Sequence, residues 1–177
     1  NYQEEIDFLV GHSERNKYIC NLVKGLTGNT LVLFQLIEKH GNILHSILEE
    51  IIDSSRKIFF VYGGTDADTR EKVRELVEKE KDAIICASYG VYSTGINIRN
   101  LHNIVFASPS KSRIRNLQSI GRGLRRSETK EAATLYDISD DLSYNGKKNY
   151  TLNHFIERVK IYTSEYFPYH IYTIPIQ

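Results

Sequence analysis

Five short apolar runs are the feature that most restricts how this chain can fold. They are continuous rather than alternating, and they lie at Thr30–Gln35, Lys57–Tyr62, Ala83–Ala87, Asn103–Ala107 and Ala133–Ile138. Continuous apolar runs of this length are typical of strands in a parallel sheet that is covered on both faces. The runs therefore predict a buried, mainly parallel β-sheet.

Helical patterns occupy the intervals between these runs. Apolar residues recur at helical spacing within residues 43–52 and 73–77, and a helix over Asp68–Lys81 begins near two candidate caps, Asp66 and Asp68. A further helix is expected over Ser13–Lys24, and another is indicated by Ile114, Leu117 and Ile120. Alternating strands and helices predict a doubly wound α/β fold with right-handed crossovers.

The predicted fold also indicates where chemistry belongs. In open α/β sheets, ligands bind beyond the carboxyl ends of the strands. We therefore expect functional groups in the loops that follow Gln35, Tyr62, Ala87 and Ala107.

The sequence changes character after Asp141. Residues 143–149 are polar and turn-rich, residues 150–166 have a helical pattern, and residues 167–177 are aromatic and β-branched. We predict a domain over residues 1–141 and an appendage over residues 142–177, a helix and an extended tail, packed on it. Stacking on unpaired bases is possible for the aromatic side chains of this region, but packing against the sheet domain is favoured for Tyr162, Tyr166, Phe167, Tyr169 and Tyr172.

Charge and composition exclude several classes of protein. The net charge is +1, but residues 111–130 hold seven Lys/Arg and one Glu, which makes them either a candidate anion-binding face or a solvated helix face. Cys20 and Cys86 lack metal-ligand spacing, and the six histidines are expected at the surface or its boundary, so no metal site is predicted. No apolar run approaches the ~20 residues of a membrane span, and no signal peptide is visible. An intracellular protein is the default expectation.

No nucleotide-hydrolysing site is complete in this sequence. The chain has no GxxxxGK[ST] phosphate loop and no acidic pair placed to hold Mg²⁺ after a strand. A self-contained NTPase needs both. The chain is therefore not expected to hydrolyse ATP unaided.

The strongest positive signal is the segment QSIGRGLRR at Gln118–Arg126. Gln118, Arg122 and Arg125 are four and three residues apart, so in a helix they share one face. The planar fork of arginine binds phosphate oxygens bidentately and keeps its charge. This pattern resembles QxxGRxxR, motif VI of the superfamily 2 helicases.

Three further segments resemble motifs of the same family, in the family's order. ASYGVYSTGINI (87–98) is similar to motif V, in which Ser88 and Thr94 offer hydroxyls to a phosphate, Gly95 permits close approach, and Asn97 replaces the Asp that meets the ATP ribose. TLVLFQ (30–35) resembles motif IV, and YGGTDADTR (62–70) resembles the turn and helix start that follow the next strand. The candidate contacts in these two segments are Gln35, Gly64, Thr65 and Arg70.

Over about residues 15–140 the chain thus resembles the second RecA-like domain of superfamily 2 helicases, most closely the phage UvsW-type DNA helicases. The resemblance implies ATP and Mg²⁺ held mainly by a first, N-terminal RecA-like domain that this chain lacks. Arg122 and Arg125 would supply arginine fingers, with Gln118 positioning the γ-phosphate, and Lys111 and Arg113 would add phosphate contacts to single-stranded or branched DNA. A phage protein of this kind would act in the host cytoplasm.

Two other classes of function stay open at this point. One is a non-catalytic nucleic-acid-binding module with a helicase-like fold, and the other is a protein-interaction domain whose basic helix docks an acidic partner. The Gln/Arg/Arg spacing favours the motor, because simple binding does not require it.

Overall fold

A computed structural model describes residues 1–62, 67–92, 100–109 and 133–176 of the chain. The helices are α1 (Tyr2–Val10), α2 (Ser13–Gly25), the π-helical turn η1 (Ile37–Gly41), α3 (Asn42–Ile51), α4 (Ala67–Lys79), α5 (Tyr89–Tyr92) and α7 (Tyr150–Ser164). The strands are β1 (Thr30–Phe34), β2 (Ile58–Val61), β3 (Ile84–Ser88), β4 (Asn103–Phe106) and β5 (Thr134–Asp137). All five predicted strands are confirmed, with ends that differ by one residue.

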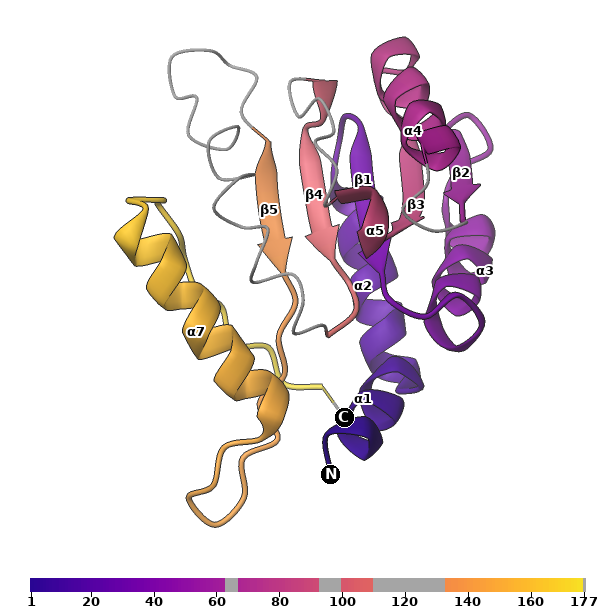
Figure 1. The fold of residues 1–177 in the computed structure, drawn as a ribbon. Helices are drawn as coiled ribbons and strands as arrows, with labels where there is room; N and C mark the ends of the chain where they lie inside the picture. The colour runs from indigo at the N-terminus through magenta and orange to yellow at the C-terminus, as the bar shows by residue number, and fades with distance from the viewer. Residues whose placement is uncertain (63–66, 93–99, 110–132, 177) are drawn as a thin grey trace.

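The five strands form one sheet in the order β2-β3-β1-β4-β5, and every pairing is parallel (Figure 1). The central strand β1 pairs with β3 on one side and β4 on the other, with Thr30 opposite Ile84 and Asn103. The predicted α/β class and parallel sheet are confirmed. All strands point the same way, so their carboxyl ends meet at one edge, the lower edge in Figure 1.

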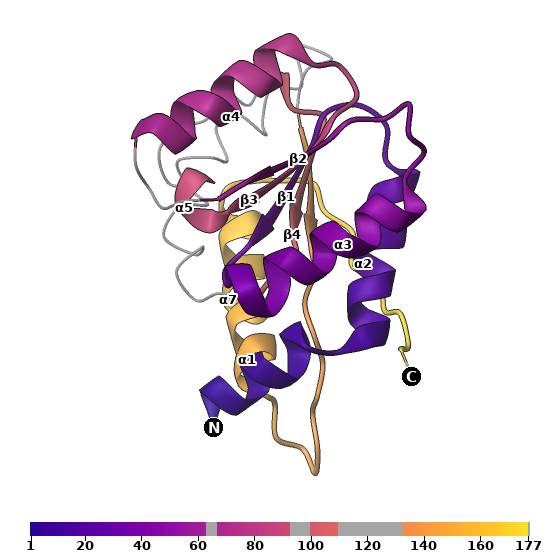
Figure 2. The same ribbon diagram turned by 90° about the vertical axis from the view of Figure 1, so that its right-hand side faces the viewer.

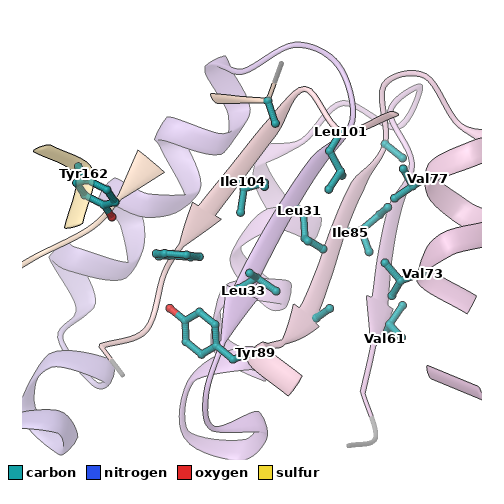
Figure 3. Packing of buried hydrophobic residues seen from close by; sticks show 14 residues of the cluster. Leu31, Leu33, Val61, Val73, Val77, Ile85, Tyr89, Leu101, Ile104 and Tyr162 are labelled. Carbon is teal, nitrogen blue, oxygen red and sulfur yellow. The ribbon is translucent and has the colours of Figure 1, made fainter. Parts of the chain in front are cut away.

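Side chains that alternate along each strand feed two separate cores. Leu31 and Leu33 of β1 pack with Val73 and Val77 of α4 on one face (Figure 3). The opposite face carries Val32 and Phe34 against helices α2 and α3, which lie together on that side of the sheet (Figure 2). Both faces of the central strand are fully buried, which explains why its sequence shows no polar alternation.

Three elements were not predicted from the sequence. Helix α1 lies in a polar, acidic stretch and begins with a capping box, in which the Asn1 side chain accepts from the Glu4 backbone. The π-helical turn η1 leads directly into α3, and the short helix α5 follows β3 without a break. The proposed Asp68 cap is wrong because Asp68 lies inside α4; Asp66 and the helix expected around Ile114 lie outside the described residues.

Helix α7 confirms the predicted helix of the C-terminal segment. Tyr162 is buried in the same apolar cluster as the sheet, and its hydroxyl donates to Asp137 Oδ2 at 2.6 Å. Arg158 is fully buried and binds the Asp137 carboxylate with two hydrogen bonds, Nε to Oδ2 at 2.6 Å and Nη2 to Oδ1 at 2.9 Å. These contacts attach α7 to the end of β5. The division of the chain at residue 141 stays a prediction.

The extended tail differs from its prediction. Phe167 is partly buried against the core, as expected, but Tyr166, Tyr169 and Tyr172 are exposed. Residues 168–176 form no helix or strand and are exposed throughout. Beyond Phe167, the tail therefore adds little to the core. Within the described ranges, no helix is both long enough and apolar enough to cross a bilayer.

Candidate site at the carboxyl edge of the sheet

The carboxyl ends of β1, β3 and β4 bring three segments together. Gln35 follows β1, Ser88 ends β3 opposite Phe34, and Ser108 lies two residues beyond β4. The Gln35 backbone N–H donates to Ser108 Oγ at 3.0 Å, so the loops after β1 and β4 touch directly. The chain leaves β1 toward one face of the sheet and leaves β3 toward the other, which is the arrangement of strand ends where ligands bind in α/β proteins.

The hydroxyl of Ser88 stands out among the polar groups at this edge. Its Oγ is buried but has no hydrogen-bond partner among the described residues. Buried hydroxyls are normally satisfied, so an unmatched one at a strand end fits a bound acceptor such as a phosphate oxygen. Ser88 thus lies at the end of β3, as the sequence predicted, and its contact with a phosphate stays a prediction.

Gln35 and Arg70 are exposed at their predicted positions. Gln35 is at the end of β1, and its side chain faces solvent. Arg70 lies in the first turn of α4 and forms no ion pair with a described residue, unlike Arg74 one turn later, which pairs with Glu71 and Glu78. Arg70 is therefore a cation available to an external anion.

The other predicted site residues lie outside the described residues. They are Gly64, Thr65, Thr94, Gly95, Asn97, Lys111, Arg113, Gln118, Arg122 and Arg125. In the described part of the chain, no group of three or more His, Cys, Asp or Glu side chains is arranged to hold a metal ion.

A buried hydrogen-bond chain supports this edge, and sequence reasoning missed it. Asn16 Nδ2 donates to the Val10 carbonyl at 2.9 Å, which turns Asn16 Oδ1 toward His40. His40 Nε2 donates to that oxygen at 2.9 Å. In a neutral ring the second nitrogen is then an acceptor, so Nδ1 accepts the hydroxyl proton of Ser108. These hydrogen bonds connect α1, α2 and η1 to Ser108, whose hydroxyl oxygen accepts from the Gln35 backbone.

The expectation that all six histidines lie at the surface or its boundary is wrong for His40. Its side chain is completely buried, because both ring nitrogens have partners that remove the cost of burial. Burial, together with the nearby charge of Arg15, lowers the pKa of His40 to about 3. Arg15 itself donates to Asp140 Oδ1 at 2.8 Å and to the Ala107 carbonyl at 2.9 Å.

Tyr89 completes the support from the other face. Its hydroxyl donates to the Ser108 carbonyl, and its ring packs edge-on against Phe106 at 5.7 Å between centroids. Ser108 is thus held through its hydroxyl by His40 and Gln35 and through its carbonyl by Tyr89. The position of Ser108, directly after the run NIVFA, could have marked it as a residue of this edge. Its buried partners are seen only in the folded structure.

The buried histidine predicts a specific pH dependence of stability. A pKa of about 3 in the folded state lies below the ordinary value of 6.5, so only the unfolded chain binds a proton at His40 between these values. This contribution is complete above about pH 6.5 and falls by up to ~1.4 kcal/mol per pH unit below it. Between about pH 7.5 and about pH 5.5, we expect His40 to account for a loss of ~1.4 kcal/mol in the free energy of urea unfolding.

The matched variants are His40→Gln and His170→Gln. His40→Gln lowers stability overall but removes this part of the pH dependence, whereas His170→Gln, at an exposed tail position, keeps it. Equal pH dependence in His40→Gln and the unaltered chain would contradict the assignment.

Comparison with known proteins adds a sequence relationship to this geometry. Residues 14–127 match the model of the helicase conserved C-terminal domain. The ATP-dependent DNA helicase uvsW of Enterobacteria phage T4 is 40% identical over 186 residues, which cover 98% of this chain and 36% of that protein. The chain therefore spans about a third of the length of this curated relative.

Solved structures agree with the fold. The crystal structure of T4 UvsW matches with a TM-score of 0.72 at 39% identity, over 93% of this chain and 35% of that one. The C-terminal domain of the DEAD-box protein Dbp5 matches with a TM-score of 0.58 at 13% identity, over 88% and 80% of the two chains. At that identity the second likeness concerns the fold alone, which is a RecA-like parallel sheet flanked by helices.

Proposed function

Because this chain belongs to the family of helicase conserved C-terminal domains, we propose that it is the second motor domain of an ATP-dependent DNA helicase or translocase. One observation carries the proposal. The family match over residues 14–127 includes the QSIGRGLRR segment, and that segment holds the arginines suited to an ATP phosphate. The similarity to uvsW supports DNA as the substrate.

The proposed nucleotide site lies between this domain and a first RecA-like domain that carries a phosphate loop. In this scheme Arg122 and Arg125 contact the γ-phosphate, and Gln118 helps to position it. Gly95 and Asn97 meet the ribose. Bound ATP with Mg²⁺, held mainly by the first domain, supplies the phosphoryl group that is hydrolysed. The role of this chain is to stabilise the negative charge that spreads over that group.

The proposed DNA contacts lie along the carboxyl edge of the sheet. Two observations support this placement: the Ser88 hydroxyl has no hydrogen-bond partner among the described residues, and Arg70 forms no ion pair with any of them. The remaining candidates for the grip on one strand's phosphates are Gln35, Gly64, Thr65, Thr94, Lys111 and Arg113. Contacts to phosphate position a strand without reading its sequence, so binding is expected to be largely independent of sequence.

The substrate and cellular setting are part of the same proposal. Single-stranded or branched DNA is the expected substrate, and unwinding, annealing and branch migration are all compatible with it. The expected partner is the N-terminal RecA-like domain of the same complete protein. A phage-encoded motor of this kind acts in the host cytoplasm.

A binding and hydrolysis experiment with the 177-residue chain tests the proposal. We expect it to bind single-stranded oligonucleotides of different sequence with similar affinity, weakening steeply as salt rises. Without a phosphate loop, it is expected to release no phosphate from ATP, with or without DNA. DNA-stimulated hydrolysis by this chain alone would contradict the division of the motor into two halves.

The Arg70→Ala and Arg74→Ala pair is a matched control for the DNA contacts. Both arginines are on α4, but Arg74 is occupied by Glu71 and Glu78. Removing Arg70, which has no ion-pair partner in the described part of the chain, is expected to weaken DNA binding and to reduce the salt slope by ~0.7, the value for one phosphate contact on a single strand. Equal effects of the two changes would remove Arg70 from the proposed interface.

A further inference from the structure

A tight turn closed by one antiparallel bridge, between Tyr144 and Lys147, lies between β5 and α7, outside the region that matches the family; it is called the hairpin below. Tyr144 and Lys147 exchange two backbone hydrogen bonds of 3.0 Å each. The two residues between them, Asn145 and Gly146, have φ values of 50° and 77°, which is the conformation of a tight type I′ turn. The tip therefore has a defined shape.

The base of the hairpin is fixed by two side chains, Asn149 and Glu5. Asn149 accepts from the Leu142 backbone at 2.8 Å and donates to the Asp140 carbonyl at 3.1 Å, so it spans both strands of the hairpin. Glu5 of α1 accepts from the backbones of Tyr150 and Thr151 at 3.0 and 2.6 Å. The hairpin is thus anchored to α1 and α7 and does not depend on the tip for its position.

The tip combines an aromatic ring with two cations. Tyr144 is 78% exposed, and the two hydrogen bonds that it makes with Lys147 involve only backbone atoms. The ring of Tyr144 is therefore not needed to hold the tip together. Lys147 and Lys148 are exposed, and neither forms an ion pair with a described residue. Asp141 is the acidic neighbour, and its carboxylate accepts from the Ser143 backbone at 2.9 Å.

The hairpin projects beyond the carboxyl edge of the sheet. Figure 1 shows it as the orange loop below the ends of the strands, and Figure 2 shows the same projection from the side. This is the edge where Ser88 and Gln35 lie. The hairpin and this edge thus lie toward the same end of the sheet.

We propose that this hairpin is a nucleic-acid contact, in which Tyr144 stacks on an unpaired base while Lys147 and Lys148 bind phosphates. Two cations beside an exposed ring are complementary to a single strand, which offers a phosphate and a base face at every nucleotide. The proposal rests on the proposed function, since it extends the same DNA-binding edge by a site beyond residue 127.

Oligonucleotide binding by the full chain at several salt concentrations tests the two parts separately. Tyr144→Ala is expected to weaken binding to single-stranded DNA roughly five- to 150-fold, the loss of one stacked base, with the salt slope unchanged. Lys147→Ala with Lys148→Ala is expected to reduce the salt slope by up to ~1.4, the value for two phosphate contacts. Tyr144→Phe retains the stacking face and is expected to bind like the unaltered chain.

Matched controls lie away from the edge. Tyr166→Ala removes an equally exposed ring at the far end of α7, and Lys79→Ala with Lys81→Ala removes the same charge near the amino end of β3. Both are expected to leave binding unchanged. Because the chain contains no tryptophan, Tyr144→Trp adds a single reporter whose fluorescence is expected to be quenched when a base stacks on it.

The outcomes separate this proposal from the one on which it rests. Hairpin variants that bind as their controls do, together with an unquenched Tyr144→Trp reporter, overturn the hairpin contact and leave the motor assignment standing. Absence of DNA binding by the unaltered chain overturns both. Weaker binding in Tyr144→Ala with quenching of the reporter establishes the contact.

Discussion

Arg122→Ala or Arg125→Ala is expected to lower ATP turnover about 10³- to 10⁵-fold in the motor that combines this domain with its phosphate-loop partner. In the proposed site each arginine reaches across to the first domain and stabilises the negative charge of the transferring phosphoryl group. Its removal therefore slows hydrolysis. Steady-state phosphate release measures the effect. DNA affinity is expected to change little, because the proposed DNA contacts are made by other residues.

Arg126→Ala is the matched control for this prediction. Arg126 is adjacent to Arg125 and carries the same charge, but it is not one of the specified positions of the QxxGRxxR pattern, which Gln118, Arg122 and Arg125 occupy. Arg126→Ala is expected to lower ATP turnover far less than Arg122→Ala or Arg125→Ala. Turnover that survives both the Arg122 and the Arg125 change would show that the arginine-finger assignment is wrong.

Arg158→Ala is expected to have the largest effect on stability, about 3–5 kcal/mol in the free energy of unfolding. The side chains of Arg158 and Asp137 are 0% and 8% exposed, so removal of the guanidinium takes a positive charge and two hydrogen bonds from a buried carboxylate. The contact of Arg158 with the Phe155 ring is lost as well. Urea denaturation followed by circular dichroism measures the change.

Arg74→Ala provides the comparison for a surface arginine. Arg74 also pairs with two carboxylates, but its side chain is 46% exposed, and exposed pairs contribute about 0–1 kcal/mol. A loss of this small size in Arg158→Ala would contradict the structural role of the buried pair. Arg158→Met with Asp137→Leu should recover much of the stability, because no charge is then left buried.

The sequence predicts the sheet well because β1, β3 and β4 are buried on both faces and the partly buried edge strands β2 and β5 still consist of short, mainly apolar runs. The same reasoning does not reach α1, whose residues are mostly polar, although Asn1 and Glu4 give a capping-box signal that could have located it. It also fails for the tail. Large rings usually pack, but Tyr166, Tyr169 and Tyr172 lie beyond the end of α7 and are exposed.

The candidate site is predictable only where a residue's position follows from a strand end. Gln35 and Ser88 satisfy that condition, and the structure places both at the carboxyl edge. His40 does not, because its burial depends on Asn16 and Ser108, which are 24 and 68 residues away in sequence. No local pattern records partners at that separation. The roles of the arginines in QSIGRGLRR stay predictions.

The order of the strands has a consequence for synthesis of the chain on the ribosome. The central strand β1 has partners only in β3 and β4, and Asn103 contacts Thr30 across 73 residues of sequence. At about 5–20 residues per second, the apolar nascent segment waits roughly 4–15 s before both neighbours have been made. Helices α2 and α3, which flank β1 in sequence and cover one of its faces, shield it during that interval. The other face depends on α4 and on strands that emerge later.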